Sequence, residues 1–130
     1  MKLNEITYAK THADFLNKKF HTNYKAWMKC SYYLNEKYEV WMIRFDGKLR
    51  DGWKNTYNGD IIKDENCYYD RKSWDGLPIP QTLNHIKLVF EIVESGYGER
   101  KYIFRGVYKY QKDISNPYKI RVYKRISSEF

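Results

Sequence analysis

Apolar and polar residues alternate most regularly in the last third of the chain. The alternation covers residues 85–93, stops at a five-residue segment with two glycines, and resumes over 101–110. Two alternating segments joined by a short glycine-containing turn predict an antiparallel β-hairpin. If the hairpin closes symmetrically about Tyr97, its apolar residues and one charge pair agree in a single register. The opposed pairs are then Phe90 and Phe104, Ile92 and Tyr102, and Glu94 and Arg100.

A third strand is predicted over residues 118–126, after the break at Asn116-Pro117. Its apolar residues share one face and its mostly basic residues the other: Ile120, Val122 and Ile126 against Lys119, Arg121, Tyr123 and Arg125. In the preceding strand, we expect the aromatic residues to lie on the inward side: Tyr102, Phe104, Tyr108 and Tyr110. Gly106, which falls opposite Leu88, predicts a bulge or bend that lets the sheet curl.

The first third of the chain predicts a helix followed by strands. Residues 1–20 favour a helix with Asn4 and Thr11 as candidate caps, and its apolar residues fall roughly on one stripe: Ile6, Phe15, Leu16 and Phe20. Residues 24–34 and 38–45 are rich in β-formers. The second of these segments is apolar on both faces, which is typical of a strand covered on both sides.

The middle of the chain predicts a tight turn and then a long loop. Asp46-Gly47 is a strong hairpin pattern, which pairs 38–45 with 48–56 across a two-residue loop. Residues 57–84 contain glycines, prolines and several Asn and Asp residues, so we expect an irregular surface segment. Within it, Trp74 is expected to anchor the loop.

Length and composition restrict the class of protein. A chain of 130 residues is expected to form one domain over 1–130. It has no run of about 18 apolar residues, which a membrane span needs, and no apolar signal-peptide region at its start. We therefore expect a small, soluble, cytoplasmic domain that does not contact membranes. Its predicted class is α+β and mostly antiparallel, with an N-terminal helix and five or six strands curled into a sheet or small barrel.

The positive charge is concentrated near the C-terminus. The formal net charge is +8, with 24 Lys and Arg against 16 Asp and Glu. Residues 1–99 hold 15 basic and 14 acidic residues, whereas 100–126 hold nine basic residues and Asp113 alone. The excess therefore lies in the last two predicted strands, where alternation places several basic side chains on one outer face.

A basic sheet face of this kind is suited to a phosphate backbone. The sequence therefore predicts a nucleic-acid-binding domain, with DNA preferred over RNA, that has no catalytic activity of its own. The candidate contact residues are Arg105, Lys109, Lys119, Arg121, Tyr123 and Arg125, with Tyr123 exposed to stack on a base. Trp53 and Trp74 are candidates for an aromatic pocket, to which Trp27 and Trp41 could also contribute.

Three alternatives stay open at this point. Lys and Arg rows can simply solvate one face of a sheet and prevent edge pairing. A small inhibitor or adaptor that docks on an acidic protein partner, in a phage–host or defence context, fits the same basic face. A metal-dependent nuclease would use Asp60 and Asp70 with Lys72. Neither the two cysteines nor the three histidines have metal-ligand spacing, so no metal, cofactor or catalytic residue is assigned.

Two C-terminal segments carry a family resemblance. Residues 102–108 (YIFRGVY) and 122–127 (VYKRIS) resemble the closing strands of small β-barrel DNA-reading domains of restriction and defence systems, of the SRA or PUA-like kind. The resemblance covers about 25 residues and includes no diagnostic motif. It implies a PUA-like barrel that reads modified DNA, either alone or separated from a nuclease domain. No base-pocket residue is assigned from it.

Overall fold

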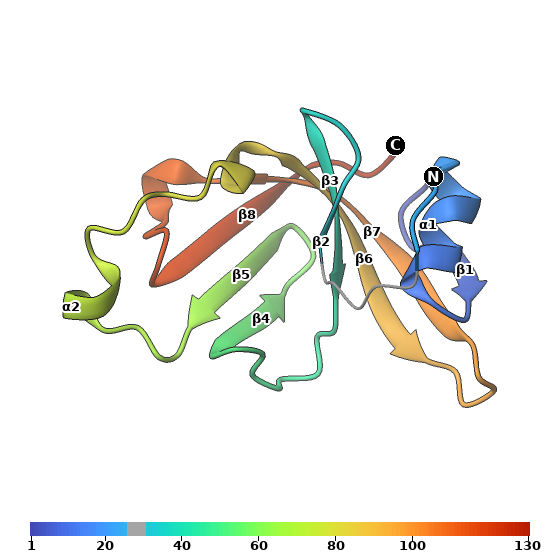
Figure 1. Ribbon diagram of the computed structural model, residues 1–130, viewed down its shortest axis with the longest axis horizontal. Coiled ribbons are helices and arrows are strands. Elements are labelled where there is room, and N and C mark those ends of the chain that lie inside the picture. The colour runs from blue at the N-terminus through green and yellow to red at the C-terminus, as the bar shows by residue number, and fades with distance from the viewer. Residues whose placement is uncertain (26–30) are drawn as a thin grey trace.

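The computed structural model describes residues 1–25 and 31–130, in which eight strands and a few short helices are found (Figure 1). In chain order these are β1 (Ile6–Ala9), α1 (His12–Phe20), β2 (Ser31–Tyr33), β3 (Tyr38–Ile43), β4 (Trp53–Tyr57), β5 (Ile61–Asn66), α2 (Arg71–Trp74), η1 (Gln81–Asn84), β6 (Ile86–Glu94), β7 (Arg100–Tyr110), η2 (Lys112–Ile114) and β8 (Ile120–Ser127).

The strands form one curled, open sheet in the order β2-β3-β6-β7-β8-β5-β4, and β1 pairs with the first part of β7. Every pairing is antiparallel except that of β3 with β6, which is parallel. The predicted α+β class with a curled, mainly antiparallel sheet is therefore confirmed. The described residues contain eight strands in a mixed sheet, more than the five or six expected.

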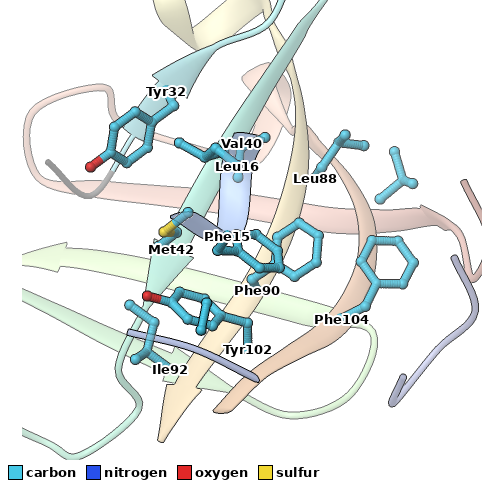
Figure 2. Packing of buried hydrophobic residues seen from close by; sticks show 12 residues of the cluster. Phe15, Leu16, Tyr32, Val40, Met42, Leu88, Phe90, Ile92, Tyr102 and Phe104 are labelled. Carbon is cyan, nitrogen blue, oxygen red and sulfur yellow. The ribbon is translucent and has the colours of Figure 1, made fainter. Parts of the chain in front are cut away.

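One face of β3, β6 and β7 packs against α1. Phe15 and Leu16 of α1 are fully buried there, and Figure 2 shows them among apolar side chains of all three strands. The Phe15 ring stacks on Tyr102, with 4.3 Å between the ring centroids. Thr11 caps α1 as predicted, since its side chain accepts a hydrogen bond from the Asp14 backbone N–H.

The opposite face carries a second apolar cluster and is called the inner face here. Its buried members come from five strands and η1: Trp41, Ile43, Ile62, Leu83, Val89, Tyr108 and Tyr123. Strand β3 therefore contributes to both clusters, with Val40 and Met42 toward α1 and Trp41 and Ile43 toward the inner face. The prediction that this strand is covered on both sides is confirmed.

The β6–β7 hairpin has the predicted register over Phe90–Phe104, Ile92–Tyr102 and Glu94–Arg100. A bulge follows, so Gly106 lies opposite Val89 rather than Leu88, and its φ of +108° suits glycine. The inserted residue reverses which face the later residues occupy. Phe104 therefore joins the α1 cluster and Tyr108 the inner cluster, so the expectation that the β7 aromatic residues share one side is wrong.

Residues 1–20 do not form a single helix. The segment before α1 is the strand β1, and Asn4 is no cap: it has a φ of 67° and its backbone N–H donates to the carbonyl of Phe104. Ile6 is exposed in β1 and takes no part in the helical stripe. Pairing with β7 therefore prevails over helix propensity in this segment. Of the predicted strand at 24–34, β2 is observed, and residues 26–30 lie outside the described part.

Asp46-Gly47 forms a turn but does not close a hairpin. The Asp46 carboxylate accepts from the Lys48 backbone N–H and from the Arg50 guanidinium, which turns the chain into a longer loop. Strand β3 pairs with β2 and β6, while β4 pairs with β5. The predicted pairing of 38–45 with 48–56 is therefore wrong.

The segment 57–84 is less irregular than predicted, because it contains the whole of β5. This strand alternates between buried and exposed residues, yet two of its buried positions hold Asp64 and Asn66. A polar residue at a buried position hides the apolar alternation that indicates a strand. Trp74, at the end of α2, packs on Tyr118 with 5.8 Å between centroids, in keeping with its expected anchoring role.

Candidate functional site

A cavity of about 510 Å³ lies on the inner face, within the size range of small-molecule pockets. Residues of β3, β4, β5, β6 and β8 line it, together with the β3–β4 loop and η1, and at one end it reaches Ser31 of β2 and His12 of α1. The lining side chains that matter for its chemistry are Glu39, Trp41, Trp53, Asn55, Asp64, Lys87, Arg121 and Tyr123.

Three polar residues form a row across one wall of this cavity. Asn55 of β4 lies opposite Asp64 of β5, and Asp64 in turn lies opposite Arg121 of β8. Paired residues on neighbouring strands point to the same face and lie about 5 Å apart. The sheet therefore places an amide, a carboxyl group and a guanidinium side by side at the cavity.

Asp64 and Asn55 present acceptor oxygens to the cavity that receive no hydrogen bond from the described residues. Asp64 is 8% exposed, and no group within 1–25 or 31–130 donates a hydrogen bond to its carboxylate. Burial raises the pKa of Asp64 to about 6, and the charge of Arg121 only partly opposes this shift. The Oδ1 atom of Asn55 is also buried, with no hydrogen-bond partner in the described part of the chain. Unsatisfied buried acceptors are costly, which makes this wall a candidate for binding a ligand that donates hydrogen bonds.

Arg121 forms no ion pair with Asp64 among the described residues and is held by other groups. Its Nε donates to the Pro117 carbonyl at 2.7 Å, and its guanidinium carbon lies 4.4 Å from the centroid of the Trp53 ring. Tyr118 flanks it further out, at 5.9 Å. The cation is therefore fixed over an aromatic ring at the edge of the cavity.

Aromatic rings form another part of the wall. Trp41 and Tyr123 contact each other with 4.8 Å between centroids, and both line the cavity. Tyr123 is 3% exposed and burial raises its pKa, with the charge of Asp64 adding to that effect. These two rings and Trp53 offer flat apolar surfaces beside the polar row.

A buried ion pair lies at the β3–β6 side of the cavity. Lys87 donates to the Glu39 carboxylate at 2.9 Å and to the Thr82 carbonyl at 2.9 Å, while His85 Nδ1 lies 2.9 Å from the same carboxylate. Both members of the pair are only 6% exposed. Removing one partner of such a pair leaves an uncompensated buried charge, so Glu39 and Lys87 each stabilise the fold as long as the other is present.

The basic row of β8 lies on the opposite face from the one predicted. Arg121, Tyr123 and Arg125 face inward, and Ile120, Val122 and Ile126 lie on the other side, where Ile126 is 50% exposed. The expectation that Tyr123 is an exposed stacking residue is therefore wrong. Alternation correctly grouped the residues but assigned the two groups to the wrong sides.

Arg125 and Arg105 are engaged in contacts within the fold. Arg125 donates to the Tyr57 hydroxyl at 3.1 Å and to the Gly59 carbonyl at 2.5 Å, and its Nε is 3.3 Å from the Tyr108 hydroxyl. Arg105 donates twice to the Glu91 carboxylate, at 2.7 and 2.9 Å. Neither guanidinium is free on an open sheet face.

The other candidate contact residues lie apart from the cavity. Lys109 and Lys119 are exposed, and the bulge at Gly106 puts Lys109 on the side opposite Arg105. Of the two candidate pocket tryptophans, Trp53 lines the cavity and Trp74 does not. Trp27 and Cys30 fall outside the described residues, and Cys67 is an exposed free thiol.

The carboxylates of the nuclease alternative are not brought together. Asp60 precedes β5 and lies 3.6 Å from Arg125, while Asp70 follows β5 and caps α2 by accepting from the Lys72 backbone N–H. The length of β5 separates them by about 20 Å. Nor do residues 1–25 and 31–130 contain any group of three or more His, Cys, Asp or Glu placed to hold a metal ion.

Of the polar row, the sequence analysis identified Arg121 and missed Asn55 and Asp64. It also missed the buried pair Glu39 and Lys87, because buried polar residues resemble solvated ones in a hydropathy pattern. The sequence signal that could have identified Asp64 is Ile62-x-Asp64-x-Asn66, because alternate residues of a strand share one face and the two polar residues therefore lie on the face of buried Ile62.

Comparisons with known proteins agree with the curled sheet. A family model described as the SET and RING associated domain (SRA) matches residues 2–130. Among solved structures, "The 5-Hydroxymethylcytosine-Specific Restriction Enzyme AbaSI" aligns over 100% of this chain with a TM-score of 0.67 and 23% identity. This chain covers 41% of that enzyme, which is less than half of its length. No curated protein matches the sequence.

Among the described residues, no helix has the length and apolarity to cross a membrane.

Proposed function

Because the chain belongs to the SRA (SET and RING associated) domain family, we propose that its inner-face cavity receives a modified cytosine turned out of a DNA duplex. Family membership confirms the resemblance of the closing strands and identifies a DNA-binding domain of the modified-base-reading kind. The observation that supports the cavity as the reading site is that the Asp64 carboxylate and the buried Asn55 Oδ1 receive no hydrogen bond from the described chain.

Cytosine matches these acceptors better than thymine does. An extruded cytosine presents its N4 amino group as a donor beside the N3 acceptor, whereas thymine presents the O4 acceptor beside an N3–H donor. An Asp64 carboxylate accepts from the N4 amino group. Because its pKa is about 6, the carboxyl group can also become protonated and then donate to N3 while accepting from N4. Asn55 Oδ1 offers a second acceptor on the same wall.

The aromatic walls and the volume fit the rest of a modified base. Base–aromatic stacking contributes about 1–3 kcal/mol per base, and Trp41, Trp53 and Tyr123 all border the cavity. A volume of about 510 Å³ is typical of pockets for drug-sized ligands, so a pyrimidine ring leaves space for a substituent. Room beyond the ring allows a modified base to be accommodated.

Matched duplexes that differ in one base test this proposal. Binding is measured by fluorescence anisotropy, at stated salt, for duplexes with cytosine, 5-methylcytosine or 5-hydroxymethylcytosine at the central position. We expect at least one modified duplex to bind about tenfold or more tightly than the unmodified one, and the Asp64→Ala variant to lose this preference. The control variant is Glu65→Ala, the neighbouring carboxylate, which faces outward on β5. Equal affinity for all three duplexes, or an unchanged preference in Asp64→Ala, would contradict the cavity as the reading site.

A further inference from the structure

The side of the sheet opposite the cavity carries a set of lysines. Residues that alternate with the cavity wall in β4, β5 and β8 point to the opposite face, called the outer face here. The bulge at Gly106 brings Lys109 of β7 to this face as well, opposite Lys124. The charged members at these strand positions are Lys54, Lys63, Lys109 and Lys124, against a single acidic residue, Glu65.

Two of these lysines face each other directly. Lys109 and Lys124 are paired residues of β7 and β8, and both are exposed. On its other side Lys124 lies opposite Ile61, and its diagonal neighbour on β5 is Lys63. Like charges directly opposed across a sheet are destabilising. In residues 1–25 and 31–130 no ladder neighbour of Lys124 on this face is acidic, so the sheet gives this charge no compensation.

The lysines differ from the arginines of the same basic segment. Arg100, Arg105 and Arg125 each lie within 4 Å of a carboxylate, and Arg121 is held over Trp53 beside the cavity. Among the described residues, Lys54, Lys63, Lys109 and Lys124 form no ion pair. In the C-terminal basic segment, these arginines therefore contact the fold or the cavity, whereas Lys109 and Lys124 face solvent.

We propose that the outer face binds the phosphate backbone of a second DNA duplex. The inference rests on the proposed function, because a duplex that delivers a base to the inner-face cavity occupies the opposite side of the sheet. The four lysines lie on the four neighbouring strands β7, β8, β5 and β4 and form an oblique row of point charges. The directly opposed pair is about 5 Å apart, and the diagonal neighbours are about 7–8 Å apart. Double-stranded DNA offers one negative charge per about 1.7 Å of helix axis, so it matches such a row without requiring a particular sequence.

The side chains of this face favour DNA over an acidic protein. Protein interfaces depend on Trp, Tyr and Arg anchors seated in pockets. The outward strand positions hold none of these, since they are occupied by lysines and by Thr56, Ile61, Glu65, Ile120, Val122 and Ile126. Point charges without anchors are suited to phosphate contacts that ignore sequence.

A two-duplex capture assay tests the proposal. A biotinylated duplex with the preferred modified cytosine is fixed on beads, the full chain is bound, and a fluorescent unmodified duplex is then added. We expect wild-type protein to retain the second duplex and Lys109→Gln/Lys124→Gln to retain about tenfold less, while both bind the first duplex equally. The matched control is Lys10→Gln/Lys18→Gln, which removes the same charge from exposed residues beside and within α1.

The possible outcomes separate the two proposals. If the protein is not retained on the modified duplex, the cavity proposal fails, and direct titration of the unmodified duplex with both double variants still tests the outer face. Equal capture of the second duplex by the two double variants would overturn the outer-face proposal, as would a lack of capture by wild type. Removing opposed lysines relieves repulsion, so the melting temperature of Lys109→Gln/Lys124→Gln is expected to stay at or above that of wild type.

Discussion

Burial of the Asp64 carboxyl group lowers the free energy of unfolding at neutral pH. Asp64 lies opposite Asn55, whose buried Oδ1 has no donor among the described residues. Burial raises the pKa of Asp64 from 3.8 to about 6. Between these two pKa values the folded state binds more protons than the unfolded state does. The free energy of unfolding therefore falls as the pH rises from about 4 to about 6, and the full cost is present above pH 7.

The size of this cost follows from the pKa shift. A shift of about two units corresponds to about 3 kcal/mol of destabilisation at neutral pH, since each unit is worth 1.36 kcal/mol. The Asp64→Asn substitution removes the ionisable group at nearly constant shape, and its amide can donate to Asn55 Oδ1. We therefore expect Asp64→Asn to be up to about 3 kcal/mol more stable than wild type at pH 7.5. For a domain of this size the melting temperature would rise by roughly 10 °C.

Urea unfolding of both proteins at pH 4 and at pH 7.5 measures this difference. The stability gain should be present at pH 7.5 and nearly absent at pH 4, where Asp64 is protonated in the folded wild type. Glu65→Gln serves as the control, because this exposed neighbour on β5 should show little difference between the two pH values. A gain that is the same at both pH values, or a loss at pH 7.5, would show that ionised Asp64 is already stabilised by a partner.

Other contacts of the fold and the cavity give further predictions. Arg125→Met should lower the free energy of unfolding by about 2–4 kcal/mol in urea titrations, because the Arg125 hydrogen bonds join β8 to β7 and the β4–β5 turn. A wild-type value would show that these bonds contribute little. Gly106→Ala should lower the free energy of unfolding by about 1–3 kcal/mol, since φ at this position is +108° and a Cβ atom would lie 3.0 Å from the Ser127 carbonyl oxygen. Unchanged stability would show that the position tolerates a side chain without strain. Trp53→Ala should weaken binding of the modified duplex about tenfold in anisotropy titrations, whereas Trp74→Ala, outside the cavity, should change it less than threefold. Equal losses in the two variants would place the stacking surface elsewhere.

The parts of the fold that were predictable depend on local pairing. The β6–β7 hairpin was placed correctly because its turn and its apolar faces agree within 25 residues of sequence. The parallel pairing of β3 with β6 joins segments more than 40 residues apart, and no local pattern specifies it. Asp46-Gly47 was misleading because the Asp46 carboxylate closes a local turn and binds Arg50 instead of bringing two strands together.

The candidate site was only partly predictable, for a related reason. Alternation showed that Arg121, Tyr123 and Arg125 share a face, but both faces of β8 mix apolar and long side chains. Which face is inner depends on Trp41, Ile62 and Tyr108, which reach it from other strands. Arg121, a predicted contact residue, lines the cavity, while its position beside Asp64 could be known only from the register of β5 with β8.

Direct observation of an extruded base tests the central claim most directly. 2-Aminopurine, whose fluorescence increases when stacking is lost, is placed next to the modified cytosine in a duplex, and the full chain is added at pH 7.5. If the cavity receives the cytosine, fluorescence should rise on binding for wild type and for Glu65→Ala, and much less for Asp64→Ala at equal occupancy. Saturating binding of wild type with no increase in fluorescence would contradict the account, because the base would then remain stacked in the duplex.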